Sequence, residues 1–264
     1  MSSKGPTITS RVAWGGVGEH FFQGHRVLGE LLGNASLTDM FFLACNDALP
    51  DAESRRVLDD LAITITAADA RIWPLKVGRI VASYGSAGIG LAASVLAYDR
   101  LSSLGPYTVA LAASFLMRFE RALAAGDRSA QDAILSEKLL PGWGIALRAQ
   151  DERYLALAAR MQGQGRCTRR FWAAHEVAVE RVREARGLEP NMSGGFAPAL
   201  LDLGIERPDR IALLVDLLCV HLAAAHVLEC AEQRPEAYRD LDLDHVEHRG
   251  VARRPVPPGG VRPG

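Results

Sequence analysis

The sequence is poor in aromatic residues and has no excess of charge of either sign. Phe, Trp and Tyr make up 6% of its 264 residues, which favours closely packed helices over a β-sandwich. Lys and Arg number 30 and Asp and Glu number 31, so no field of one sign exists to attract nucleic acid or an anionic membrane. We therefore expect neither as a partner.

The sequence also lacks the patterns of disulfide frameworks, zinc sites and secretory signals. Its cysteines have no CxxC spacing: Cys45, Cys167, Cys219 and Cys230. Reduced thiols in a cytoplasmic protein are the better interpretation. The first ten residues have no apolar signal core. We expect a cytoplasmic protein without a bound metal.

One segment, Ile80–Tyr98, is almost free of charge and is about as long as a membrane span. It is rich in serine and glycine, and Arg79 and Asp99 flank it closely. Small residues let two helices approach each other inside a protein. The segment therefore predicts a buried or subunit-interface helix rather than a membrane helix.

Helix-start signals and helical periodicity dominate the rest. Ser36 followed by Asp39 three residues later predicts a capped helix, and Asp51 after Pro50 predicts another. Alternation at Thr7–Trp14 predicts the only strand, as one arm of a short hairpin. Further helices are expected at Pro106 to about Leu123, Asp151–Met161, Thr168–Arg186 and Pro208 to about Glu232.

The order of six short segments is the most informative feature of the chain. They are Gly24–Gly33, Thr38–Ala44, Leu49–Glu53, Arg79–Ser83, Leu200–Ile205 and Ala225–Glu229. Over roughly residues 8 to 240, this order resembles the citrate synthase superfamily, especially its citryl-CoA lyase branch. The resemblance implies an all-α fold with a large and a small lobe and an obligate homodimer.

The resemblance also implies a chemistry and a domain organisation. Members of this family enolise an acyl-CoA, and they form or cleave a carbon–carbon bond as transferases or lyases. Coenzyme A would then be part of a substrate, and no cofactor would be bound permanently. We expect an N-terminal arm at 1–23, a helical domain at 24–246 with its small lobe at roughly 130–210, and a flexible tail at 247–264.

The positions at which the family keeps its catalytic groups have other residues in this sequence. By the resemblance, Thr108 replaces the acid His, Ile145 the carbonyl-polarising His, and Ser193 the base Asp. By the same resemblance, Asp69 occupies the position of a substrate-binding His. Arg153 resembles the arginine that family members retain and that binds a substrate carboxylate. A hydroxyl is no base at neutral pH and Ile145 cannot donate a hydrogen bond; losing one such donor costs about 10²–10³ in rate. We therefore do not expect citrate synthase activity, the condensation of acetyl-CoA with oxaloacetate.

A replacement set of functional groups is available in the Asp69–Lys76 segment, which combines an acid, two cations and an indole. Such groups suit an aromatic or anionic small molecule. The alternative is that Trp73 anchors a loop whose charges are solvated and paired. We take Asp69, Thr108 and Ser193 as candidate catalytic residues. The candidate substrate-binding residues are His25, Arg71, Trp73, Lys76, Tyr107, Trp143, Arg153 and Asn191.

Two questions stay open at the level of sequence. His226 and Glu229 share a helical face, for which a structural role is favoured over a metal site. The protein is either a divergent enzyme acting on a CoA thioester or related carbonyl compound, a ligand-binding or regulatory pseudoenzyme, or a CoA-independent condensing or cyclising enzyme of a biosynthetic pathway.

Overall fold

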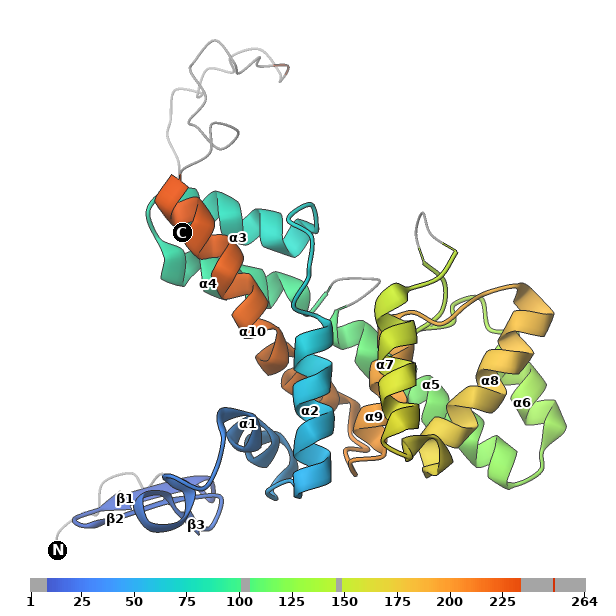
Figure 1. Cartoon of the computed structure of the whole chain (residues 1–264), viewed down its shortest axis with the longest axis horizontal. Helices are drawn as coiled ribbons and strands as arrows, with labels where there is room; N and C mark the ends of the chain where they lie inside the picture. Colours follow the sequence, from blue (N-terminus) through green and yellow to red (C-terminus); the bar gives the residue numbers. More distant parts are fainter. Residues whose placement is uncertain (1–8, 101–104, 146–148, 234–248, 250–264) are drawn as a thin grey trace, which may run out of the picture.

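The computed structural model describes residues 9–100, 105–145, 149–233 and 249, and these form helices except for a small sheet near the N-terminus (Figure 1). The predicted all-α class is confirmed. The helices are α1 (Leu37–Asn46), α2 (Ala52–Thr64), α3 (Trp73–Ser83), α4 (Ala87–Tyr98), α5 (Pro106–Ala124), α6 (Arg128–Leu135), α7 (Glu152–Gly163), α8 (Arg170–Arg186), α9 (Met192–Leu201) and α10 (Pro208–Gln233), with a short 3₁₀ turn at Arg166–Thr168.

The N-terminal sheet is antiparallel, with the order β1 (Ala13–Gly16), β2 (Glu19–Phe22) and β3 (His25–Arg26). Trp14 pairs with Phe21 across the first two strands. The predicted hairpin is present but lies later than the expected strand, whose first residues are outside the described part of the chain. The expectation of helix from residue 24 onward needs correction, because a third strand and a π-helical turn at Val27–Leu31 come first.

The predicted helix starts at Ser36 and Asp51 are confirmed. Ser36 and Asp39 form a reciprocal capping box, in which the Asp39 backbone N–H donates to the Ser36 hydroxyl at 3.2 Å. The Ser54 N–H donates to the Asp51 carboxylate at 2.7 Å. Each cap satisfies an N–H that the helix itself leaves without a partner.

The segment Ile80–Tyr98 is not one helix, as we expected, but the end of α3 and the whole of α4. Gly85 has a φ of +92°, a left-handed conformation that ends α3 and reverses the chain. The two helices then cross closely at Gly78 and Gly90. A Cβ at Gly78 would meet the Gly90 carbonyl oxygen at 2.6 Å, so glycine permits this crossing. The small residues pack within the chain.

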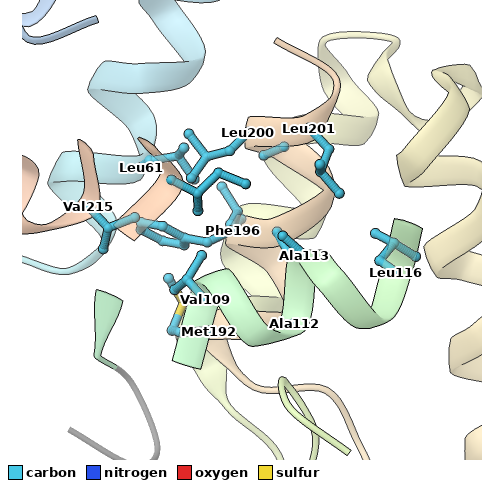
Figure 2. Close-up of a cluster of buried hydrophobic side chains, with 14 of the residues drawn as sticks. Leu61, Val109, Ala112, Ala113, Leu116, Met192, Phe196, Leu200, Leu201 and Val215 are labelled. Atoms are coloured by element: carbon cyan, nitrogen blue, oxygen red, sulfur yellow. The ribbon is translucent and has the colours of Figure 1, made fainter. Parts of the chain in front are cut away.

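The core is built around α10, which packs against α3, α4, α5 and α1. Its mean hydropathy over 18 residues is 2.2, and α10 is long and apolar enough to cross a membrane by that measure alone. In this fold 44% of that stretch is buried, and α10 packs along its length against other helices of the chain (Figure 1). Figure 2 shows where α5, α9 and α10 meet, with Phe196 of α9 directed toward Val215 of α10.

Helices α5 to α9 lie toward the N-terminal end of α10, whereas α3 and α4 lie beside its C-terminal half (Figure 1). The expected small lobe at roughly 130–210 covers α6 to α9, but the division into two lobes stays a prediction. Most of the expected tail at 247–264 lies outside the described residues. The important consequence for function is that the N-terminal ends of α5, α7 and α9 converge near the middle of α10.

Candidate active site

A small cavity marks the place where these helix ends converge. Its volume is about 20 Å³ and its walls are largely apolar. Val109, Met192 and Val215, three of its lining residues, lie around the ring of a fourth, Phe196, in Figure 2. The complete lining consists of Ile65, Val109, Arg153, Met192, Ser193, Phe196, Val215 and Cys219. Two residues predicted from the sequence, Arg153 and Ser193, therefore meet at this cavity.

Arg153 is fixed in position by Asp151, a residue that our sequence analysis did not select. The Arg153 Nε and Nη2 atoms donate to the two Asp151 carboxylate oxygens at 3.0 and 3.1 Å. The same carboxylate accepts the Met192 N–H at 3.2 Å, which ties the start of α7 to the start of α9. Burial acts to raise the pKa of Asp151, but the Arg153 hydrogen bond and the Met192 N–H hold it below its ordinary value.

The Arg153 guanidinium is thus aimed at the cavity and keeps donor capacity for a ligand. Within the described residues, Nη1 of Arg153 has no acceptor, because its pair with Asp151 uses Nε and Nη2. A guanidinium held in this way matches the geometry of a carboxylate. The Asp-x-Arg spacing at the start of α7 was the sequence signal that could have identified Asp151.

Asn191 and Trp143 do not line the cavity; both side chains are engaged in contacts within the protein. The Asn191 Nδ2 donates to the Gly144 carbonyl at 2.9 Å, and its Oδ1 accepts the Ser193 N–H at 3.0 Å. Trp143 is 9% exposed and its ring centroid lies 5.6 Å from that of His175. These contacts join the loop before α7 to the first turn of α9.

His175 is the most deeply buried ionisable group near this loop. Tyr154 Oη lies 3.2 Å from its Nε2, and the rings of Trp143, Tyr154 and Trp172 surround it. Burial lowers the pKa of His175 to about 4. The imidazole is therefore neutral near pH 7 and acts as a packed core residue.

Thr108 and Ser193 occupy corresponding places, in the first turns of α5 and α9, and both are buried. Ile145 follows Gly144 in the loop between α6 and α7 and is partly buried. A hydroxyl of Ser or Thr stays protonated at neutral pH, so neither residue is a base by itself.

The structure does not bring the Asp69–Lys76 segment to the cavity. Asp69 lies in the exposed loop between α2 and α3, where its carboxylate accepts hydrogen bonds from the Arg71 guanidinium at 2.7 to 3.1 Å. These hydrogen bonds lower the pKa of Asp69 to about 2. Trp73 and Lys76, at the start of α3, are exposed. The expected role of Asp69 as a proton carrier therefore needs correction, because so strong an acid is a poor base near neutral pH.

His25 and Tyr107 also lie outside the lining of the cavity. His25, on β3, has its Nδ1 3.9 Å from the Glu30 carboxylate. The Tyr107 ring is 42% exposed and lies beneath the Arg100 guanidinium, whose carbon is 4.5 Å from the ring centroid. In a single chain, then, these two residues and the Asp69–Lys76 segment form surfaces separate from Arg153 and Ser193.

His226 and Glu229 form part of a structural network. His226 Nε2 lies 3.0 Å from the Ala68 carbonyl oxygen, and Arg79 forms an ion pair with Glu229. Among the residues that the structure describes, no group of three or more His, Cys, Asp and Glu side chains could hold a metal. The network links α10 to α3 and to the loop that contains Asp69.

Two ionisable groups near the cavity were missed by the sequence analysis, Tyr98 and Asp216. Tyr98 is 4% exposed, and neither its hydroxyl nor the Oδ1 atom of Asp216 has a hydrogen-bond partner among the described residues. Asp216 is half-buried and directly follows Val215 on α10; Val215 and Cys219 line the cavity, whereas Asp216 is adjacent to that lining in the chain and is not part of it. Buried polar atoms without partners are costly, and they are found where a ligand or a reaction uses them.

The electrostatic environment of this pair is unusual. Burial raises the pKa of Asp216 to about 7, and the nearby Asp99 carboxylate raises it further in the same direction. Burial and the charge of Asp216 raise the pKa of Cys219 to about 12. Burial also raises the pKa of Tyr98, against the opposing charge of Arg153. One feature of the sequence could have identified Asp216 as a candidate: it is the only carboxylate within the apolar run Ile211–Val220.

Comparisons with known proteins extend this picture. No protein-family model and no curated protein matches the sequence. In structure, the chain is similar to the citryl-CoA lyase from Hydrogenobacter thermophilus, with a TM-score of 0.75 and 24% identity over 96% of this chain and 98% of that one.

Two larger proteins are similar over part of their length. One is the ATP citrate lyase from Methanothrix soehngenii in complex with citrate and coenzyme A, with a TM-score of 0.71, 14% identity, and coverage of 95% of this chain and 43% of that one. The other is the citrate synthase from Thermoplasma acidophilum, with a TM-score of 0.58, 14% identity, and coverage of 84% of this chain and 59% of that one.

Proposed function

We propose that this chain, which has the citrate synthase fold, forms or breaks a carbon–carbon bond next to the carbonyl of a CoA thioester or related carbonyl compound. The proposed active site is the cavity at the starts of α5, α7 and α9, and Asp216 is the proposed proton carrier. The observation that supports this most strongly is the half-buried carboxyl of Asp216, whose pKa lies near 7, whose Oδ1 has no partner among the described residues, and which follows the lining residue Val215 on α10. General bases are most effective when their pKa is close to the working pH.

The roles of the remaining groups follow from their protonation states. Enolisation needs a base for the proton next to the carbonyl and a neutral donor for the enolate oxygen. The raised pKa keeps Tyr98 protonated, so that its hydroxyl is a donor. Arg153 offers Nη1 to a substrate carboxylate. The apolar wall formed by Val109, Phe196 and Val215 excludes water from the reacting carbon.

The size of the cavity restricts which part of the substrate it can enclose. Pockets for complete small ligands usually measure about 300–1,000 Å³, and this cavity, at about 20 Å³, is far smaller. It has room for a group about the size of one water molecule, so only the reacting carbonyl or carboxylate end of a thioester would enter it, with the rest of the molecule outside.

A direct test measures proton transfer without knowledge of the second substrate. We expect the protein in D₂O to exchange the hydrogens next to the carbonyl of acetyl-CoA or propionyl-CoA, or to cleave citryl-CoA, as followed by mass spectrometry. In contrast, we expect no condensation of acetyl-CoA with oxaloacetate, since Thr108, Ile145 and Ser193 replace the groups that this reaction uses. Condensation at about 1 s⁻¹ or faster in a thiol-release assay would contradict this expectation.

A ligand-binding pseudoenzyme is the second candidate, favoured by the same three replacements, which leave no His, Asp or Glu in the first turns of α5 and α9. In that case calorimetry would detect binding of coenzyme A or citrate, while none of the thioesters would exchange or be cleaved. That pair of results would reject the proposed enzymatic function.

We further propose that the protein is a homodimer that associates through α3 and α4. Ile80 of α3, Tyr84 at its C-terminal end, and Ile89 and Leu96 of α4 are exposed large apolar residues on two adjacent helices, and Leu96 is 77% exposed. Contiguous apolar surface of this kind is typical of subunit interfaces.

The expected result is that Leu96→Glu converts a dimer to a monomer in light scattering, because the new charge would be buried against the partner. Leu139→Glu is the matched control, since Leu139 is 79% exposed in the loop between α6 and α7 and should not affect assembly. If the wild-type protein is a monomer at micromolar concentration, or both variants stay dimeric, this interface is not used.

A further inference from the structure

A second pocket, far from the cavity, contains an arginine that is largely buried and has no partner among the described residues. The pocket measures about 190 Å³ and is lined by Glu53, Arg56, Gly163, Gln164 and Arg166. Arg166 is 6% exposed, yet within the described residues its guanidinium takes part in no hydrogen bond and no ion pair. A guanidinium has five N–H donors, and burying such a charge without a partner is strongly unfavourable.

The carboxylates nearest to Arg166 are already engaged with other groups. Asp202 accepts the Phe171 and Trp172 N–H groups at 2.8 and 3.0 Å. Asp51 caps α2, and Glu53 forms an ion pair with Arg169 at 3.6 Å. Their charges therefore act on Arg166 from a distance, without satisfying its donors.

The remaining groups of the pocket favour an anion. Arg56 is exposed in the second turn of α2 and has no ion pair among the described residues. The N-terminal end of α2 lies at the pocket, and its dipole adds partial positive charge. Gln164 is held in place by its Nε2, which donates to Asp60 at 2.6 Å.

We propose that this pocket binds a phosphate group, either free or as a phosphate ester, through the guanidinium groups of Arg166 and Arg56. The planar fork of Arg166 matches the oxygens of a phosphate, which would supply the acceptors that the protein does not. The site is separate from the proposed active site. It lies at the start of α2 and the end of α7, whereas Ile65 and Arg153 line the cavity from the opposite ends of the same two helices, roughly 15–20 Å away along their axes.

The test is thermal unfolding with inorganic phosphate against sodium chloride at equal ionic strength. For the wild-type protein, we expect a saturable increase in Tm of about 3–5 °C at a phosphate concentration ten times the Kd. Arg166→Gln should abolish this increase, and Arg56→Gln should raise the half-saturating concentration about threefold to tenfold. Arg121→Gln is the matched control, since Arg121 is an exposed arginine at the end of α5 and should leave the response unchanged.

A second measurement separates a binding role from a structural one. Without phosphate, Arg166→Gln should unfold at the wild-type temperature or above it, because the variant no longer buries an unpaired cation. If it unfolds well below wild type and still responds to phosphate, or if wild type responds equally to chloride, the proposal is overturned. Should Arg166→Gln fail to fold, an unchanged response of Arg56→Gln would overturn it. Titration with AMP distinguishes the occupants: a shift at tenfold lower concentration identifies a phosphate ester, and an equal shift identifies the free ion.

Discussion

Asp216→Asn is expected to lower the rate of hydrogen exchange next to the thioester carbonyl by about 10²–10⁴-fold, the usual contribution of a positioned general base. The amide is close in shape to the carboxyl but cannot accept the proton. In the wild-type protein, the exchange rate should rise with pH and level off above about pH 7, where Asp216 is deprotonated. The pH profile is the signature that a purely structural role for Asp216 would not produce.

The same variant should be more stable than the wild-type protein at alkaline pH. Burial raises the pKa of Asp216 from 3.8 to about 7, so between these pH values the folded chain binds more protons than the unfolded chain. Stability therefore falls as pH rises from about 4 to 7, and the full penalty applies above pH 7. Asp216→Asn removes this penalty, and we expect a gain on the order of 1–2 kcal/mol at pH 8, reduced from the full shift because solvent partly screens the group.

Asp69→Asn is the matched control for both measurements. Asp69 is an exposed carboxylate paired with Arg71, and the structure places it outside the cavity. Its replacement should leave the exchange rate within about twofold of wild type and should not increase stability at pH 8. Equal loss of exchange in the two variants, or an unchanged rate in Asp216→Asn, would contradict the assignment of Asp216.

Gly142→Ala is expected to destabilise the fold by on the order of 3 kcal/mol and to disturb the cavity, because it separates the loop before α7 from α9. Gly142 has a φ of +91°, which costs an L-residue about 1–2 kcal/mol. In addition, an alanine Cβ would meet the Gly194 Cα at 2.9 Å, and such overpacking adds about 1–3 kcal/mol. Chemical denaturation measures the change.

Gly144→Ala separates the two contributions. Gly144 has a similar φ of +78°, but an added Cβ there would find Leu188 only at an ordinary 3.9 Å. We expect it to lose about 1 kcal/mol, the conformational part alone. Equal losses in the two variants would show that the contact between Gly142 and Gly194 is not tightly packed.

The sequence predicted the candidate site only in part. Arg153 and Ser193 were identified from the order of motifs, and the structure brings both to the cavity. The Asp69–Lys76 segment was expected there too, but pairing between Asp69 and Arg71, two residues apart, satisfies both charges locally at the surface. Sequence proximity of charges thus suggested a site where the structure shows an ion pair in a loop.

Local features were determined by the sequence alone, since each depends on residues only a few positions apart. The capped helix starts at Ser36 and Asp51, and the helices expected from Pro106 and Asp151, formed where the pattern predicted. The all-α class also followed from the sequence, through composition, periodicity and the order of its segments.

Only the tertiary structure determined which ionisable groups are unusual. Tyr98, Arg153 and Asp216 are far apart in the chain, and the fold brings the charge of Arg153 close enough to Tyr98 to act on its pKa. Asp216 has a pKa near 7 because packing removes water from its carboxyl, and Arg166 is largely buried at a pocket without an ion pair among the described residues. The cost of burying a charge depends on neighbours from every surrounding helix, so no local sequence pattern can determine it.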